Sequence, residues 1–176
     1  MRELPKTKTA TRRSKLETAS WFAVVRAYLE CSRRYTQMLQ HFDLTIAQFD
    51  ALRAIESLGG EATPKAIAER LVVTRANISG VLKRLQERRL IVLRPHGEDG
   101  RSMLCAHTPT GQALTAVAHE AASRFVRAQL KPFNNTDLHQ VESLMRDMHA
   151  HLQTLDPEGI AQPSPELELL KSGGAQ

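Results

Sequence analysis

The amino-acid sequence predicts a mainly α-helical protein with one small β-hairpin, and three observations lead to this fold class. Long stretches carry apolar residues at steps of three and four, which is the period of an amphipathic helix. Two short helical segments follow each other with a link of only a few residues, as in a helix-turn-helix. Two short apolar runs, the first rich in β-branched side chains, flank a stretch of turn-forming residues, which is typical of a hairpin.

The first predicted helix covers residues 16–42. Neither Gly nor Pro interrupts it, and its apolar positions recur at helical spacing: they include Trp21, Val25, Tyr28, Tyr35, Leu39 and Phe42. The preceding residues 1–15 hold six Lys or Arg side chains against one Glu. We expect this strongly basic segment to be a flexible arm.

Three further helices are expected between residues 44 and 88. Thr45, Thr63 and Thr74 are each placed to cap the start of one of them, because a threonine hydroxyl accepts a hydrogen bond from the first helical turn. Gly59 and Gly60 are expected to end the first of the three helices. Only a few residues separate the second from the third, which is the helix-turn-helix pattern.

A β-hairpin is expected after these helices, with strands at residues 90–94 and 102–107. The residues between them, 95–100, are Pro, Gly, His and acidic side chains, a composition that favours a turn. Together with the preceding helices, this hairpin predicts a winged helix-turn-helix over about residues 44–107.

Two long helices are expected over about residues 110–155. The second carries a seam of apolar side chains that step by three and four, as in a coiled coil, namely Leu138, Val141, Met145, Met148, Leu152 and Leu155. A monomer would expose this seam, so we expect residues 16–42 and 110–155 to form the dimerisation helices of a homodimer. Residues 16–155 then make one domain. Residues 156–176 hold three prolines and are expected to be a flexible tail.

The composition narrows the class of protein. A net charge of +5 points to nucleic acid or anionic lipid as the partner of a basic surface. No stretch approaches the ~20 uninterrupted apolar residues of a membrane-spanning helix, and no signal-peptide pattern is present, so we expect a cytoplasmic protein. Cys31 and Cys105 are too isolated for a disulfide framework. No nucleophile–base set, phosphate-binding loop or metal pair is found, so neither enzymatic activity nor a cofactor is expected.

The predicted helix that begins after Thr74 has two contrasting faces. One is apolar and holds Ile78, Val81, Leu82 and Leu85, whereas the other is small, polar and basic. A helix in the major groove needs short side chains where its backbone comes close, polar groups that reach the base edges, and cations for the phosphates. The candidate DNA contacts are Thr74, Arg75, Ala76, Asn77, Ser79, Lys83 and Arg84.

Gly80 lies on the same outward face. A glycine inside a helix costs about 1 kcal/mol relative to alanine, so its presence favours a close approach of the backbone to a partner over an ordinary solvated face.

The hairpin adds Arg94 before the turn and Arg101 after it, with Asp99 two residues before Arg101. A carboxylate at that separation can orient the Arg101 guanidinium, and an oriented Arg suits the narrow, electronegative minor groove. The alternative is a solvent-exposed loop without a function.

Together these motifs resemble the MarR (multiple antibiotic resistance regulator) family. The resemblance covers about Trp21 to Leu155, and its motifs lie at residues 44–52, 67–71, 73–79, 83–85, 90–91, 99–102 and 104–111. It implies an obligate dimer in which the first, fifth and sixth helices interlock and a winged helix-turn-helix on each flank reads a palindromic operator. It also implies, as in many members, a repressor that a small aromatic or carboxylate effector releases from DNA. The helix after Thr74 would then be the recognition helix, with Asp99 and Arg101 at the wing tip.

By the same resemblance, the effector pocket lies between the DNA-reading lobe and the dimerisation helices. Its candidate residues are Trp21, Arg26, Phe49, Asp50 and Arg53. An arginine beside aromatic rings can hold a carboxylate while the rings cover an apolar body. The alternative is that Trp21 and Phe49 are only core side chains.

Three other functions stay open at this point. Some relatives sense oxidants through a cysteine, and Cys31 is the candidate here, although a buried structural thiol is favoured. Other relatives bind zinc, and Glu30, Cys31 and His41 resemble part of that ligand set. The fifth helix offers His119 with Ser123 one turn later instead of two histidines, so no metal site is expected. A helical protein-interaction module would explain the apolar seam but not the basic helix or the wing.

Overall fold

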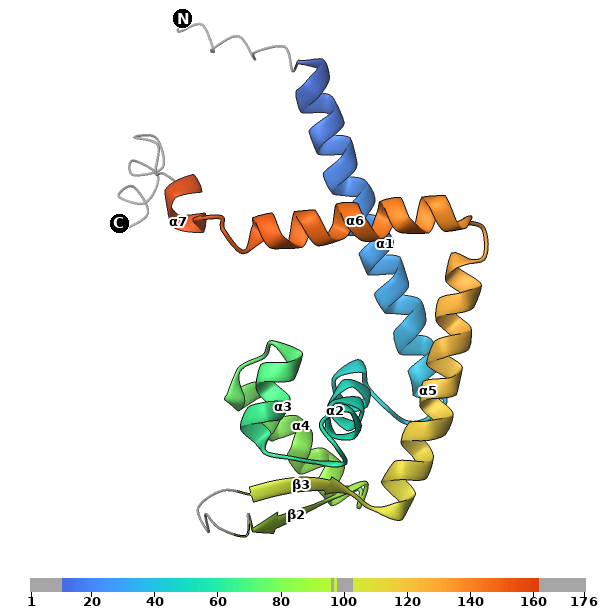
Figure 1. Ribbon diagram of the computed structural model, residues 1–176, viewed down its shortest axis with the longest axis vertical. Helices are drawn as coiled ribbons and strands as arrows, with labels where there is room; N and C mark the ends of the chain where they lie inside the picture. Colours follow the sequence, from blue (N-terminus) through green and yellow to red (C-terminus); the bar gives the residue numbers. More distant parts are fainter. Residues whose placement is uncertain (1–10, 96, 98–102, 162–176) are drawn as a thin grey trace, which may run out of the picture. The chain divides into compact units, whose positions relative to one another are not determined.

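The computed structural model describes residues 11–95, 97 and 103–161 of the chain (Figure 1). The chain forms two compact units, the first ending at Ala128 and the second beginning at Gln129. The first unit contains the helices α1 to α4, most of α5 and a small β-sheet, and the second contains α6 and α7. The predicted fold class, mainly helical with a small β-structure, is confirmed.

Helix α1 spans Arg12–Gln40 and begins earlier than expected. The hydroxyl of Thr11 accepts a hydrogen bond from the backbone N–H of Ser14 and so caps the first turn. Residues 12–15, which the charge pattern placed in a flexible arm, are therefore helical. The rest of that arm, residues 1–10, lies outside the described residues. Leu39 is the fully buried side chain of α1, close to its C-terminal end.

The winged-helix lobe contains α2 (Ile46–Ser57), α3 (Pro64–Leu71) and α4 (Arg75–Glu87). The three predicted threonine caps are all confirmed, since each hydroxyl accepts a hydrogen bond from the backbone three residues on. The turn between α3 and α4 passes through Val72, which has a positive φ of 55°. This left-handed residue reverses the chain direction within the helix-turn-helix.

A three-stranded antiparallel sheet completes the lobe. Its strands are β1 (Glu61–Ala62), β2 (Ile91–Pro95) and β3 (Met103–His107), in the order β1-β3-β2. The predicted hairpin is β2 with β3, and its tip falls outside the described residues. Strand β1 was not predicted, because two residues are too few to show an alternating pattern; it forms by pairing with Ala106 and Cys105 of β3.

The first turn of helix α5 (Pro109–Leu130) is bonded to the winged-helix lobe. The Thr108 hydroxyl donates a 2.7 Å hydrogen bond to the carbonyl oxygen of Arg89 and accepts one from the backbone N–H of Gly111. A Cβ atom on Gly111 would lie 1.8 Å from the carbonyl oxygen of Leu90, so only glycine fits this approach. The start of α5 is thereby joined to the segment that enters β2.

The second unit contains α6 (Asn135–Leu152) and α7 (Pro157–Ile160). Asn134 and Asp137 form a reciprocal capping box at the start of α6. Residues 157–160, which we expected to belong to a flexible tail, form the helical turn α7, and Asp156 caps it. Residues 162–176 lie outside the described part. Among the described helices, none is long and apolar enough to cross a membrane.

Candidate nucleic-acid interface

Helix α4 is held in the lobe by its apolar face. Ile78, Leu82 and Leu85 are 2%, 4% and 0% exposed, and they belong to the buried cluster of the lobe. At the C-terminal end of the helix, the guanidinium of Arg88 donates a hydrogen bond to the backbone carbonyl oxygen of Asp43. Packing along one face and this bond at one end fix which side of α4 points outward.

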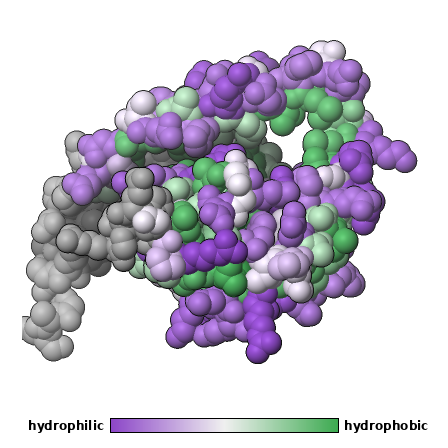
Figure 2. Space-filling model, turned by 60° about the horizontal axis from the view of Figure 1, so that its bottom comes forward, coloured by the Kyte–Doolittle hydropathy of each residue, from purple (hydrophilic) through white to green (hydrophobic). Residues whose placement is uncertain are grey.

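The outward side of α4 is the polar and basic one that the sequence predicted. All the candidate contacts on or before this helix are exposed, namely Thr74, Arg75, Ala76, Asn77, Ser79, Lys83 and Arg84. On the face that Figure 2 shows, hydrophilic side chains dominate the visible surface, and apolar ones show in smaller patches. The helix therefore presents hydrogen-bonding groups near its N-terminal end and cations further along.

Two of these polar groups already have partners within the helix. The Thr74 hydroxyl caps the helix by accepting from the N–H of Asn77 at 3.3 Å. The Ser79 hydroxyl donates to the carbonyl oxygen of Arg75 at 2.8 Å. Asn77 is exposed, and its side chain extends from the first turn of α4. Among these three residues, Asn77 is the one best suited to read a base edge.

Gly80 faces open space. A Cβ atom built there meets no atom of the chain within 4 Å, in contrast to Gly111. The packing of the described residues does not require a glycine at this position. The helix-propensity cost of Gly80 thus has no explanation among the described residues, and close approach by a partner stays a prediction from the sequence.

The base of the wing contains an ion pair that the sequence did not reveal. Arg94 on β2 lies 3.2 Å from the Glu61 carboxylate on β1, across the intervening strand β3. Both side chains are about half exposed, so the pair orients Arg94 more than it stabilises the fold. Glu61 was missed because its role depends on β1. Asp99 and Arg101 lie outside the described residues.

The five predicted effector residues do not form one site within the chain. Phe49 lines a cavity of about 410 Å³ together with Tyr35 of α1. The other lining residues come from α5, namely His119, Ala122, Ser123, Val126 and Arg127. Asp50 and Arg53 line a different cavity, of about 220 Å³, which also includes Arg70.

Trp21 and Arg26 are not part of the Phe49 cavity. Trp21 is 60% exposed, and Arg26 lies over the ring of Phe22 at 5.7 Å. Fourteen residues of helix separate Trp21 from Tyr35, which is roughly 21 Å at the helical rise of about 1.5 Å per residue. The cavity residues on α5 were missed because no local pattern relates them to Phe49.

The Phe49 cavity has aromatic walls and basic side chains at its edge. The rings of Tyr35 and Phe49 meet edge to face with centroids 6.3 Å apart, and Tyr35 meets Phe125 in the same way at 5.3 Å. Burial raises the pKa of the Tyr35 phenol, and the negative charge of Asp50 adds to this shift. The phenol therefore stays protonated and can donate a hydrogen bond. Arg127 and His119 supply the polar groups that an anionic ligand needs.

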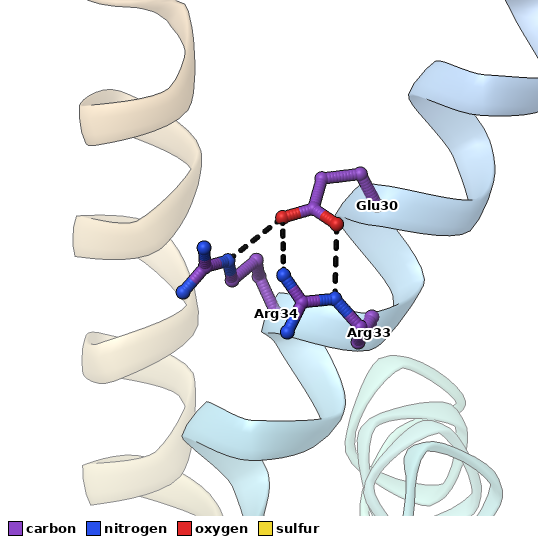
Figure 3. A network of polar contacts seen from close by, with 3 residues as sticks. All are labelled: Glu30, Arg33 and Arg34. Carbon is purple, nitrogen blue, oxygen red and sulfur yellow. Dashed lines mark hydrogen bonds and ion pairs between the residues drawn. The ribbon is translucent and has the colours of Figure 1, made fainter.

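Glu30, the acidic residue of the hypothetical zinc site, is bonded to two arginines instead. Glu30 accepts hydrogen bonds from the Arg33 guanidinium at 2.9 and 2.6 Å and from Arg34 at 2.8 Å (Figure 3). These bonds lower the pKa of the Glu30 carboxyl to about 2. Within the described residues no group of three or more His, Cys, Asp or Glu side chains is arranged to hold a metal ion.

The two cysteines differ in environment. Cys105 on β3 is fully buried, and burial raises the pKa of its thiol to about 11, so it stays protonated and unreactive. Cys31 is half-buried in the middle of α1. A redox role for Cys31 stays a prediction from the sequence.

The winged-helix lobe is the part of the chain that matches a known protein family. Residues 42–102 match the model of the MarR family. An uncharacterised HTH-type transcriptional regulator of Bacillus cereus is 27% identical over 132 residues, which cover 74% of this chain and 87% of the relative. A regulator of Bacillus anthracis with the same description matches with the same identity and coverage.

Solved structures show the same fold. The regulator RdhR, bound to 2,4-dichlorophenol, superposes with a TM-score of 0.73 at 18% identity and covers 94% of this chain and 98% of its own. A mutant of MarR from E. coli complexed with operator DNA gives a TM-score of 0.66 at 21% identity, with coverages of 72% and 90%. BpsR of Bordetella bronchiseptica, whose DNA binding is regulated by 6-hydroxynicotinic acid, gives 0.59 at 24%, with coverages of 72% and 98%.

The family match falls on the part of the chain that forms α2, α3, α4 and the hairpin, and the solved relatives share this arrangement. The helix-turn-helix, the outward polar face of α4 and the wing strands are the parts that such proteins bring to DNA. The chain has a winged helix-turn-helix fold, and its residues 42–102 are similar to the MarR family of transcriptional regulators.

Proposed function

We propose that this protein is a repressor that binds a palindromic operator as a homodimer and leaves it when a small aromatic carboxylate binds. The observation that carries the proposal is the division of α4 into a buried apolar face and an exposed polar face with open space over Gly80. An ordinary surface helix has no need of a glycine there. A helix that enters the major groove does.

In the proposed complex, the residues of α4 divide into two groups. Arg75, Asn77 and Ser79 lie near the N-terminal end and read base edges, whereas Lys83 and Arg84 lie further along and neutralise phosphates. Arg94, which pairs with Glu61 at the base of the wing, would contact the DNA backbone. By the resemblance, Asp99 and Arg101 act at the wing tip. The operator complex of E. coli MarR supports DNA as the partner.

The proposed dimer follows from uncovered apolar side chains. Helix α6 buries none of its residues, and five of its apolar side chains are 39–63% exposed: Val141, Leu144, Met145, Met148 and Leu152. Helix α1 also exposes large apolar groups, including Trp21, Phe22 and Leu29. Surfaces of this kind in a water-soluble regulator are covered by a partner. A second copy of the chain would cover them and pair two recognition helices on a palindrome.

The Phe49 cavity is the proposed effector site. Its volume of about 410 Å³ suits a ligand of one or two rings. The rings of Tyr35 and Phe49 would cover the apolar body, and Arg127 and His119 would hold the carboxylate. The structures of RdhR with 2,4-dichlorophenol and of BpsR, regulated by 6-hydroxynicotinic acid, support an aromatic ligand class.

Selection of DNA fragments tests the DNA-binding part of the proposal. Genomic or random fragments are incubated with the full chain at near-physiological salt, and the retained fragments are sequenced. We expect a palindromic motif with half-sites about one helical turn apart. Retention without any enriched sequence, equal for the wild type and for an Asn77→Ala variant, would contradict sequence-specific regulation.

Gly80→Ala is expected to raise the free energy of unfolding by about 1 kcal/mol, because alanine is the better helix former. The added methyl group meets nothing within 4 Å, so no packing penalty offsets this gain. Binding to the operator should weaken nevertheless, since the methyl group occupies the space through which the groove approaches. Urea denaturation and fluorescence anisotropy with labelled operator measure the two effects.

Gly111→Ala is the matched control for this prediction. The same added methyl group lies 1.8 Å from the Leu90 carbonyl oxygen, and we expect a loss of roughly 1–3 kcal/mol in stability from overpacking. If Gly80→Ala bound the operator as tightly as the wild type, α4 would not approach the groove closely.

Arg127→Ala is expected to weaken binding of 6-hydroxynicotinic acid by at least tenfold. A hydrogen bond to a charged group contributes about 1.5–3 kcal/mol, and Arg127 is the permanent cation that lines the Phe49 cavity. Isothermal titration calorimetry without DNA measures the effect. Arg124→Ala is the control, because Arg124 lies on the same helix, pairs with Glu120 and does not line this cavity. Equal losses for both variants would place the carboxylate elsewhere.

A further inference from the structure

A second, largely apolar cavity opens at the surface of the winged-helix lobe, beside the N-terminal end of α4. Its volume is about 360 Å³, and it is lined by the start of α2, the end of α3 and the first two turns of α4. Six of its lining side chains are apolar, among them Ile46, Val73 and Val81, and the two polar ones are Asp50 and Asn77. It shares no lining residue with the Phe49 cavity.

Asp50 is the unusual group in this cavity. Its side chain is half-buried, and burial raises the pKa of its carboxyl. Other acidic side chains of the lobe have cationic partners: Glu56 pairs with Arg53, Glu61 with Arg94, and Glu69 with Lys65. Within the part of the chain that the structure describes, Asp50 has no hydrogen-bond or ion-pair partner.

The neighbouring arginine does not satisfy this carboxylate. Arg53 follows Asp50 by three residues on α2, but its guanidinium is bonded to Glu56. The Asp50 carboxylate is only half-buried and so is partly desolvated, and a bound cation or hydrogen-bond donor would offset that cost. The cavity therefore offers an apolar surface with one anionic group, Asp50, that has no ion-pair partner among the described residues.

We propose that this cavity binds a small organic cation, a protonated primary amine with an apolar body of about one ring. The ammonium would donate hydrogen bonds to the Asp50 carboxylate, and the body would lie against Ile46, Val73 and Val81. An aromatic carboxylate is excluded from this site, because its anionic group would face Asp50. The ligand class is thus opposite in charge to the one that fits the Phe49 cavity.

The position of the cavity gives the ligand a route to DNA binding, and this step rests on the proposed function. Asn77 and Ile78 line the cavity from α4, the helix that we propose to enter the major groove. A ligand that engages or displaces Asn77 changes the affinity for DNA, and DNA changes the affinity for the ligand by the same factor. We expect the amine to weaken operator binding.

The test measures binding of 2-phenylethylamine to the full chain by calorimetry in the absence of DNA. The anion 3-phenylpropionate, of similar size, serves as the matched probe. We expect saturable binding of the amine, whereas binding of the anion, whose class fits the Phe49 cavity, should not change in Asp50→Asn. Asp50→Asn, which keeps the volume and removes the charge, should weaken amine binding at least tenfold. Glu69→Gln, an acidic side chain of α3 outside the cavity, should leave it unchanged.

A second variant keeps the test independent of the charge change. Ala47 lines the cavity and is exposed, so Ala47→Trp fills the space without disturbing the core and should abolish amine binding. Circular dichroism confirms that each variant is folded. No binding of the amine to the wild type, or equal binding to the wild type, Asp50→Asn and Ala47→Trp, would overturn the proposed site.

The effect on DNA is measured separately, by operator titrations with and without the amine. Weaker operator binding in the wild type and no change in Asp50→Asn would support the coupling. Unchanged operator affinity at saturating amine would overturn the coupling alone. Because amine binding is measured without DNA, a failure of the proposed regulatory function does not affect the result for the cavity.

Discussion

Replacing Asn77 by alanine is expected to reduce the preference for operator over random DNA by about tenfold. Asn77 is exposed near the start of α4, and a good side-chain contact to a base edge contributes about 1–3 kcal/mol of discrimination. Lys83→Ala should instead weaken operator and random DNA alike and reduce the slope of log affinity against log salt by about one. Anisotropy titrations with both DNAs at several salt concentrations separate the two effects.

Ser79→Ala and Lys131→Ala complete this set of variants. The Ser79 hydroxyl already donates to the Arg75 carbonyl oxygen, so its loss should cost less discrimination than the loss of Asn77. Lys131, exposed between α5 and α6, is the matched control for Lys83, because the same charge is removed outside the lobe. Equal losses on operator and random DNA for every α4 variant would show that α4 does not read the sequence.

The double variant Val141→Glu with Met148→Glu is expected to convert the protein from a dimer to a monomer. The wild type should have a mass of about 39 kDa, twice the 19.7 kDa of the chain. Val141 and Met148 are 50% and 40% exposed on α6, and a carboxylate at each would be buried without a partner in a dimer. Light scattering at low micromolar concentration measures the mass.

Loss of the dimer should also weaken operator binding. Joining two binding modules raises the overall affinity by roughly 10²–10⁴-fold, so a monomer that holds one half-site should lose a factor of this size. Glu142→Gln is the control, because Glu142 is also exposed on α6 and pairs with Arg146 on the same helix. A monomeric wild type, or a double variant that stays dimeric, would contradict the proposed interface.

The helices, their starts and the two faces of α4 follow from local sequence. The hydroxyls of Thr45, Thr63 and Thr74 cap the helices that their positions predicted, because capping involves residues only three apart. Gly59 and Gly60, which the sequence placed at the end of α2, both have positive φ angles. The burial of Ile78, Leu82 and Leu85 follows from the helical period, which is also a local property.

Two predictions from local sequence were wrong, the start of α1 and the absence of a helix at residues 157–160. The start of α1 was placed too late because charge density in residues 1–15 outweighed the capping signal of Thr11. Helix α7 was missed because a run with three prolines favours an irregular tail, although one of these prolines, Pro157, occupies the first turn where proline is tolerated.

The cavities and ion pairs were decided by tertiary structure. Glu61 and Arg94 are 33 residues apart and meet only because both strands pair with β3. Phe49 acquires its polar neighbours from α5, and Asp50 lacks a partner because Arg53 bonds to Glu56 instead. The sequence determined which segments are helical and which face of α4 is polar, since these depend on residues within one or two turns. Which side chains share a cavity depends on how distant helices pack, and no local period carries that information.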